Sequence, residues 1–137
     1  MATQVHLKIF TPEKEIFSDS VDMVIVPAPD GPVGILPHHA NLMSKVASGE
    51  LIIKKGSSTR YLAVGDGFLQ ILDGEAVVLT DLAKTHEEID EKLVEEARVR
   101  AKEALSKTLS DEEYATTLAA LEKSLAQLRV KRRHKNL

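Results

Sequence analysis

The sequence predicts an all-β sandwich followed by a C-terminal antiparallel two-helix hairpin. Three observations support this fold class. Short runs of alternating apolar and polar residues fill the chain up to Thr80, turn-forming residues separate these runs, and from Thr85 onward the apolar residues recur every three or four positions. We therefore expect a β-sandwich domain over residues 1–84 and an α-helical hairpin domain over residues 85–137.

The first strand is expected in VHLKIF, where Val5, Leu7 and Ile9 occupy alternate positions and therefore share one buried face. Five further strands are expected at residues 22–26, 50–55, 59–64, 67–72 and 75–80. Gly56 and Gly74 lie in the turns between consecutive runs and can take the positive φ that tight hairpins require. Many short strands without a helical pattern between them favour a sandwich or a barrel over an α/β fold.

Two amphipathic helices are expected after residue 84. Thr85 and Glu88 fit a capping box at the start of the first helix, and a second box begins at Ser110. The expected apolar stripes are Ile89, Leu93, Ala97, Ala101 and Leu105 on the first helix, and Tyr114, Leu118, Leu121, Leu125 and Leu128 on the second. The turn between the helices is short, so they run antiparallel. Such a hairpin can bury one stripe on itself and need not stay docked on the sandwich.

The composition narrows the classes of function. The formal net charge is −3, which argues against a general nucleic-acid-binding protein because such proteins carry a basic excess. Without cysteine there is no thiol nucleophile, disulfide or cysteine-ligated metal site. The N-terminus does not resemble a secretion signal, and no apolar run is long enough to span a bilayer. We therefore expect a cytoplasmic protein that can belong to a membrane complex.

No catalytic motif stands out in the sequence. Neither glycine-rich stretch is followed by the Lys-Ser or Lys-Thr of a phosphate-binding loop. HEEID resembles a zinc-protease helix only superficially, because Asp90 stands where the second histidine belongs. His38 and His39 are adjacent, so in an extended segment they point to opposite sides and do not share a ligand. These observations favour a binding or mechanical role without a metal or cofactor.

Two stretches carry a resemblance to a known family. FTPEKEIFSDSVDMVIVPAPDGPVGILPHHANLM (residues 10–43) is similar to the N-terminal signature of the ε subunit of F-type ATP synthases, including its Gly-x-x-Gly-Ile-Leu-Pro-x-His-Ala run at residues 31–40. YLAVGDGFLQI resembles a later strand of that family, and the expected helices match its C-terminal half. The resemblance covers the whole chain.

The resemblance implies a non-catalytic rotor subunit in the central stalk of a bacterial ATP synthase. It would couple the c ring to the γ subunit, and its hairpin could extend along γ toward the catalytic β subunits and inhibit ATP hydrolysis. The implied location is peripheral, on the cytoplasmic face of the bacterial inner membrane. Whether the ring moves protons or sodium ions is left open, and no nucleic-acid partner is implied.

The implied site residues form two groups. The expected contacts with the c ring or γ are Gly31, Pro32, Val33, Gly34, Ile35, Leu36, Pro37, His38, His39 and Ala40. The expected inhibitory contacts are Arg98, Arg100, Lys102, Lys123, Arg129, Lys131, Arg132 and Arg133, with Lys135 beyond them. The chain departs from the family pattern at several of these positions. Pro32 and Val33 replace an acid and a leucine, His38 replaces a common glycine, and Asn41 replaces a frequent proline.

An alternative function is nucleotide sensing, because some members of the family bind ATP through an Ile/Leu-Asp-x-x-Arg-Ala motif in the hairpin. Ile89 and Asp90 match the start of this motif, whereas Leu93 and Val94 replace its arginine and alanine. Arginine is well suited to binding phosphate, so its loss predicts weak or absent ATP binding. On this interpretation Ile89 and Asp90 are a vestige of the motif.

Overall fold

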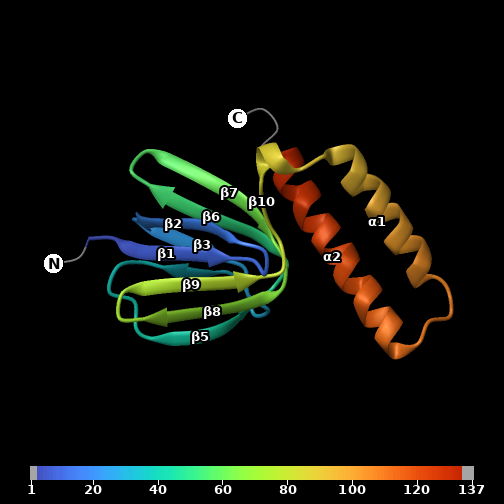
Figure 1. Cartoon of the computed structure of the whole chain (residues 1–137), viewed down its shortest axis with the longest axis horizontal. Coiled ribbons are helices and arrows are strands. Elements are labelled where there is room, and N and C mark those ends of the chain that lie inside the picture. Colours follow the sequence, from blue (N-terminus) through green and yellow to red (C-terminus); the bar gives the residue numbers. More distant parts are fainter. Residues whose placement is uncertain (1–2, 134–137) are drawn as a thin grey trace.

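The computed structural model describes residues 3–133, and it consists of a β-sandwich with a helical hairpin at one end (Figure 1). The first sheet has the strand order β2-β1-β9-β8-β5, and the second has the order β10-β7-β6-β3-β4. The strands of the first sheet are β1 (Val5–Phe10), β2 (Glu15–Val21), β5 (Leu42–Val46), β8 (Gly67–Leu72) and β9 (Glu75–Thr80). Those of the second are β3 (Met23–Val26), β4 (Val33–Ile35), β6 (Gly49–Lys55), β7 (Ser58–Val64) and β10 (Ala83–Thr85).

The core lies between the two sheets and follows the predicted alternation. Val5, Leu7 and Ile9 of β1 are at most 2% exposed, and they pack with inward residues of both sheets. Gly56 and Gly74 adopt φ of 59° and 82°, as expected for their tight turns. The predicted fold class is confirmed.

Several strands differ from the sequence-based expectation. β2, β4, β5 and β10 were not expected, because they are short or lie at a sheet edge, where one-sided burial leaves little alternation. The parallel pairing of β1 with β9 joins segments far apart in the sequence, so no local pattern indicates it. β10 pairs with β7 and ends at Thr85, so the expected domain boundary falls within this strand.

The hairpin consists of α1 (Glu91–Leu105) and α2 (Asp111–Arg133), preceded by the 3-10 helix η1 (His86–Glu88). The expected capping box at Thr85 forms, but it caps η1. The first helix therefore begins later than expected, at Glu91, and Asp90 is its N-cap residue. The expected box at Ser110 is present, because the Ser110 hydroxyl accepts a hydrogen bond from the Glu113 amide at 3.1 Å.

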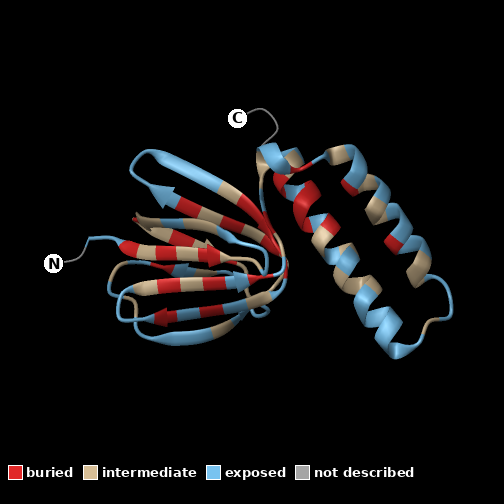
Figure 2. Ribbon diagram, viewed as in Figure 1, coloured by how far each residue is buried: buried red, intermediate tan, exposed pale blue. Residues whose placement is uncertain are grey.

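The expected apolar stripes are only partly buried (Figure 2). Leu93, Tyr114 and Leu125 are 61%, 48% and 43% exposed, so the expectation that they are covered is wrong. The physical reason is the position of α2, which packs on α1 along one side and on β6 and β7 along the other. Burial is concentrated in the last part of α2, at Ser124, Ala126, Gln127, Leu128 and Val130.

Candidate functional site

The segment 31–40, expected to be one contact surface, is divided by β4 into two turns. Gly31 closes the turn before β4, with φ of 118° and its amide donating to the Ala28 carbonyl at 3.0 Å. β4 then pairs antiparallel with β3, so that Val33 lies opposite Val26 and Ile35 lies opposite Val24. Because β4 separates them, the two turns lie at different places on the sandwich. They can contact two different partners or two parts of one.

The residues of β4 differ in accessibility. Ile35 is fully buried in the core between the sheets, Val33 is partly buried against that core, and Gly34 faces solvent. Pro32 is exposed. Ile35 therefore supports the fold, and the accessible parts of this first half are Gly31, Pro32 and Gly34.

The second turn contains Leu36, Pro37, His38, His39 and Ala40. Leu36 is 54% exposed. His38 has φ of 67°, the left-handed region that favours glycine. This conformation gives a physical reason for the glycine that is common at this position in the family. The His39 ring nitrogen Nδ1 lies 2.7 Å from the Ala40 carbonyl oxygen, which orients the ring along the turn.

The second turn is fixed to the turn between β8 and β9, because Asn41 Oδ1 accepts a hydrogen bond from the Asp73 amide at 3.0 Å. The β8–β9 turn lies at the end of the sandwich opposite the helices (Figure 1). Leu36 and its neighbours are therefore presented at the end of the sandwich away from the hairpin.

Sequence reasoning missed an apolar surface on the outer face of the first sheet. We define the outer face by Met43, Phe68, Leu72 and Leu79, which are 71%, 56%, 49% and 51% exposed. Phe68 lies opposite Leu79, and Leu79 lies opposite Phe10, so these three side chains form a row across three strands. Exposed apolar side chains gathered in this way are typical of protein–protein contacts. The alternating pattern in the sequence predicts which residues point inward and outward, but it does not indicate whether the outward residues gather into an apolar surface that binds another protein.

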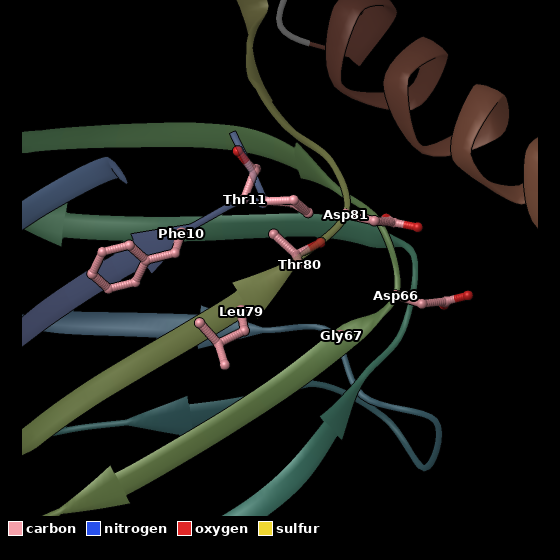
Figure 3. A pocket seen from close by; sticks show the side chains of 8 residues that line it. Phe10, Thr11, Asp66, Gly67, Leu79, Thr80 and Asp81 are labelled. Carbon is pink, nitrogen blue, oxygen red and sulfur yellow. The ribbon is translucent and has the colours of Figure 1, made fainter. Parts of the chain in front are cut away.

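A cavity of about 340 Å³ lies at the hairpin end of this outer face, beside the side chains of Phe10 and Leu79 (Figure 3). Asp66 and Asp81 also line it, and in Figure 3 their side chains point away from the Phe10 ring. The Asp81 carboxylate instead forms an ion pair with Lys123 of α2, with 2.6 Å between Oδ2 and Nζ. The cavity and the docked hairpin therefore share one acidic residue.

Five of the eight expected inhibitory residues already have polar partners within the chain. Arg98 pairs with Glu95, Lys123 with Asp81, Arg132 with Glu91 and Glu95, and Arg133 with Glu50, while Lys131 donates to the His86 carbonyl. Arg100, Lys102 and Arg129 are exposed. Lys135 lies outside the described residues. The basic surface expected for a partner is thus largely used to hold this conformation together.

The charge network between the helices shifts several pKa values. Hydrogen bonding by Arg98, helped by the nearby charge of Arg132, lowers the pKa of Glu95. The carboxylates of Glu91 and Glu95 raise the pKa of Arg132, with the hydrogen bond that Arg132 donates to Glu91 as the main cause. Each shift favours the charged form, so the two helices are joined by ionised groups at neutral pH.

The residues of the ATP motif have structural roles in this conformation. Ile89 is 3% exposed and packs with Ala63 and Leu128. Asp90 accepts a hydrogen bond from the Leu93 amide at 3.2 Å and so caps α1. Leu93 points to solvent. Nearby, Arg98, Arg129 and Arg132 line a cavity of about 330 Å³ with Leu125 and Leu128, but two of these arginines are paired with glutamates.

Within residues 3–133, no three His, Asp or Glu side chains are placed to hold a metal ion together. Neither helix in this part of the chain combines the length and apolarity needed to cross a bilayer. The accessible features are two turns, an apolar sheet face and an ion-paired hairpin. These are features of a protein-binding subunit.

Comparison with known proteins agrees with this class. Residues 4–86 match the family model of the ATP synthase Delta/Epsilon chain beta-sandwich domain, and residues 87–132 match that of the ATP synthase Delta/Epsilon chain long alpha-helix domain. The chain therefore belongs to the ATP synthase delta/epsilon chain family, and the resemblance to ε subunits of F-type ATP synthases is confirmed.

Similar curated proteins extend over nearly the whole chain. It is 43% identical to the ATP synthase epsilon chain of Chloroflexus aggregans over 96% of this chain and 94% of the relative. It is 36% identical to the epsilon chain of Syntrophobacter fumaroxidans over 95% of this chain and 97% of that relative.

Two solved structures share the fold. A chain in the Euglena gracilis mitochondrial ATP synthase structure of OSCP, F1 and c-ring matches with a TM-score of 0.78 and 22% identity, covering 92% of this chain and 80% of that one. A chain in the Tetrahymena thermophila mitochondrial ATP synthase structure of the central stalk and c-ring matches with a TM-score of 0.63 and 12% identity, covering 93% of each.

Proposed function

We propose that this chain is a non-catalytic rotor subunit of the central stalk of a bacterial F-type ATP synthase, coupling the c ring to γ. The observation that carries the proposal is the match of both halves to epsilon-chain domains, in a molecule that exposes an apolar sheet face. The titles of the structural neighbours, which name the c-ring and the central stalk, also support it. The subunit is peripheral, on the cytoplasmic side of the inner membrane, and works without a cofactor.

The rotor contacts are assigned to the sandwich. The apolar outer face lies on paired strands, and the two turns of segment 31–40 are joined to β4, which pairs with β3, so sheet pairing restricts the movement of both surfaces. A rigid contact loses little conformational freedom on binding, which suits a part that transmits torque. The hairpin is not part of these surfaces, so it can inhibit ATP hydrolysis without breaking the rotor contacts.

The second proposed role is inhibition of ATP hydrolysis by the hairpin. Arg100, Lys102 and Arg129 are exposed in the docked state, and release of the hairpin would break the contacts that Lys123, Lys131 and Arg133 make with Asp81, the His86 carbonyl and Glu50. These cations would then be available to acidic segments of the catalytic β subunits.

The proposal is tested by co-purification with γ and the detergent-solubilised c ring. A chain ending after His86, which retains β10, is expected to fold on its own and to co-purify with both partners as the full chain does. The hairpin alone, residues 87–137, is expected not to co-purify. A cooperative melt of the shortened chain is the control for folding. If the hairpin fragment co-purified with γ and the c ring while the folded sandwich did not, the rotor contacts would lie in the hairpin and the proposal would be wrong.

The alternative role, nucleotide sensing, is tested by calorimetric titration of the isolated chain with ATP and magnesium. Binding is expected to be weak or absent, because Leu93 replaces the arginine of the motif. Leu93→Arg, at an exposed position, is expected to increase affinity by about tenfold to a hundredfold, the value of one charge-assisted contact. Val99→Arg, also exposed on α1, is the matched control. Micromolar binding by the unchanged chain would favour the sensing role.

A further inference from the structure

The contact between the hairpin and the sandwich is made mainly by α2, although α1 comes first in the chain (Figure 1). These contacts are made by the second half of α2, from Lys123 onward. Val130 and Leu128 belong to a buried cluster with Ala63 of β7, Ile89 and Val94, and Tyr61 of β7 packs against this cluster. The first turns of α2 are exposed and extend beyond the sandwich (Figure 2). The apolar part of this interface is therefore small.

Three cations of α2 surround this apolar contact. Lys123 Nζ lies 2.6 Å from Asp81 Oδ2, Lys131 Nζ donates to the His86 carbonyl at 2.9 Å, and Arg133 Nη1 lies 2.9 Å from Glu50 Oε1. At about 100° per residue, Lys131 and Arg133 project to opposite flanks of Val130, and Lys123 lies on the same side of the helix two turns earlier. Lys123 reaches the segment after β9, Lys131 reaches η1 and Arg133 reaches β6, so together they fix the orientation of the helix.

The acceptors on the sandwich are themselves held in place. The Asp81 amide donates to the Asp66 carbonyl at 3.2 Å, and a β-carbon at Gly65 would collide with Asp81 Oδ1, so glycine at position 65 leaves space for the carboxylate in this orientation. The Glu50 side chain is only 6% exposed, whereas that of Arg133 is 61% exposed. The sandwich thus provides fixed acceptors, and α2 provides cations that solvent and other proteins can reach.

We propose that Lys123, Lys131 and Arg133 form a charge latch that holds the hairpin on the sandwich, and that an acidic protein surface opens the latch by competing with Asp81 and Glu50 for these cations. The inference deepens the proposed inhibition and rests on it for the natural competitor, an acidic surface of the catalytic subunits. Docking and inhibition then exclude each other because they use the same side chains.

Competition is feasible at the Lys123–Asp81 pair, because both of its side chains are partly exposed and such a pair is individually weak. An exposed ion pair shifts an equilibrium only a few-fold, and salt screens it further. A surface with several carboxylates can bind the exposed flanks of Arg133 and Lys123 before the helix leaves, since these side chains are 61% and 32% exposed. Release of the latch is therefore expected to depend steeply on the number of negative charges presented.

The test measures docking in the full, isolated chain. Because the chain contains no cysteine, spin labels can be placed at Ser57→Cys on the β6–β7 turn and Lys107→Cys between the helices, both exposed positions. The distance distribution between the labels gives the ratio of docked to released hairpin. The probes are an oligoglutamate peptide and an oligoglutamine peptide of equal length, at matched ionic strength.

The variants separate charge from shape. Asp81→Asn keeps the shape and is expected to lower the docked-to-released ratio a few-fold, and Lys123→Asp to lower it about tenfold. Combining Asp81→Lys with Lys123→Asp is expected to restore docking. The matched control is Asp19→Lys, which breaks the exposed Lys55–Asp19 pair of the sandwich and is expected to leave the ratio unchanged.

Oligoglutamate is expected to release the hairpin of the unchanged chain, and oligoglutamine is not. If neither the Lys123 and Asp81 variants nor oligoglutamate changed the distances between the labels, the latch would be overturned. The apolar contact would then be the cause of docking. Equal release by both peptides would overturn the charge competition. These readouts need no ATPase, so a latch that opens in a chain that fails to inhibit hydrolysis would refute only the proposed function.

Discussion

Leu36→Asp is expected to leave the sandwich folded and to detach the chain from the stalk, whereas Ile35→Asp is expected to unfold it. The two residues are neighbours, but Ile35 is fully buried and Leu36 is 54% exposed. A carboxylate at position 35 would have no polar partner in an apolar core, at a cost of more than about 4 kcal/mol out of a typical total of about 5–15 kcal/mol. At position 36 the carboxylate stays in solvent, and the effect on stability is within about 0.5 kcal/mol.

The expected loss of stalk affinity for Leu36→Asp is about tenfold to a hundredfold, because the new charge would be desolvated at an interface centre. Affinity for the γ–c ring assembly is measured by co-purification and by surface binding, with a thermal melt of each variant. Leu125→Asp, at an exposed leucine of the hairpin, is the matched control and is expected to bind normally. Normal binding by Leu36→Asp would remove the second turn from the contact surface.

The contrast between these neighbours shows what the sequence could and could not predict. The alternation that places Val5, Leu7 and Ile9 in the core is a local pattern, and it identified the sandwich. The segment around Ile35 and Leu36 has no such alternation, because a strand of three residues is too short to repeat a period. The family motif marked the segment as one site, whereas the pairing of β4 with β3 divides it.

The docking of α2 on the sandwich could not be predicted from the sequence, for a different reason. The sequence pattern indicates the side of α2 that faces α1, because leucines recur there. The side that faces the sandwich contains Lys123, Gln127 and Val130, and two of these are polar. The docking of this side depends on small side chains that allow close approach, such as Ala63 of β7, and on acceptors in distant parts of the sandwich, such as Asp81. Such contacts between distant residues have no periodic signal in the sequence.

Removal of the hairpin is expected to raise ATP hydrolysis by the reconstituted catalytic head, because the residues assigned to inhibition all follow residue 90. The shortened chain, ending after His86, retains β10 and the apolar outer face, so attachment to the stalk is expected to persist. Activity is measured as steady-state hydrolysis with equal amounts of bound full-length and shortened chain, so that a change in rate does not reflect a change in occupancy.

A second variant keeps the hairpin and neutralises three cations near the end of α2. Neutralising Arg129, Arg132 and Arg133 with glutamine removes contacts to an acidic partner, but it also removes the internal pairs of Arg132 and Arg133. The hairpin would then leave the sandwich more easily and yet bind the catalytic subunits less well. If electrostatic capture causes inhibition, the catalytic head reconstituted with this variant hydrolyses ATP faster than the head with the unchanged chain, despite the looser docking. If the extended helices inhibit by blocking rotation sterically, the head with this variant hydrolyses ATP more slowly than the head with the unchanged chain. Unchanged hydrolysis after complete removal of the hairpin would refute the regulatory role and leave the coupling role intact.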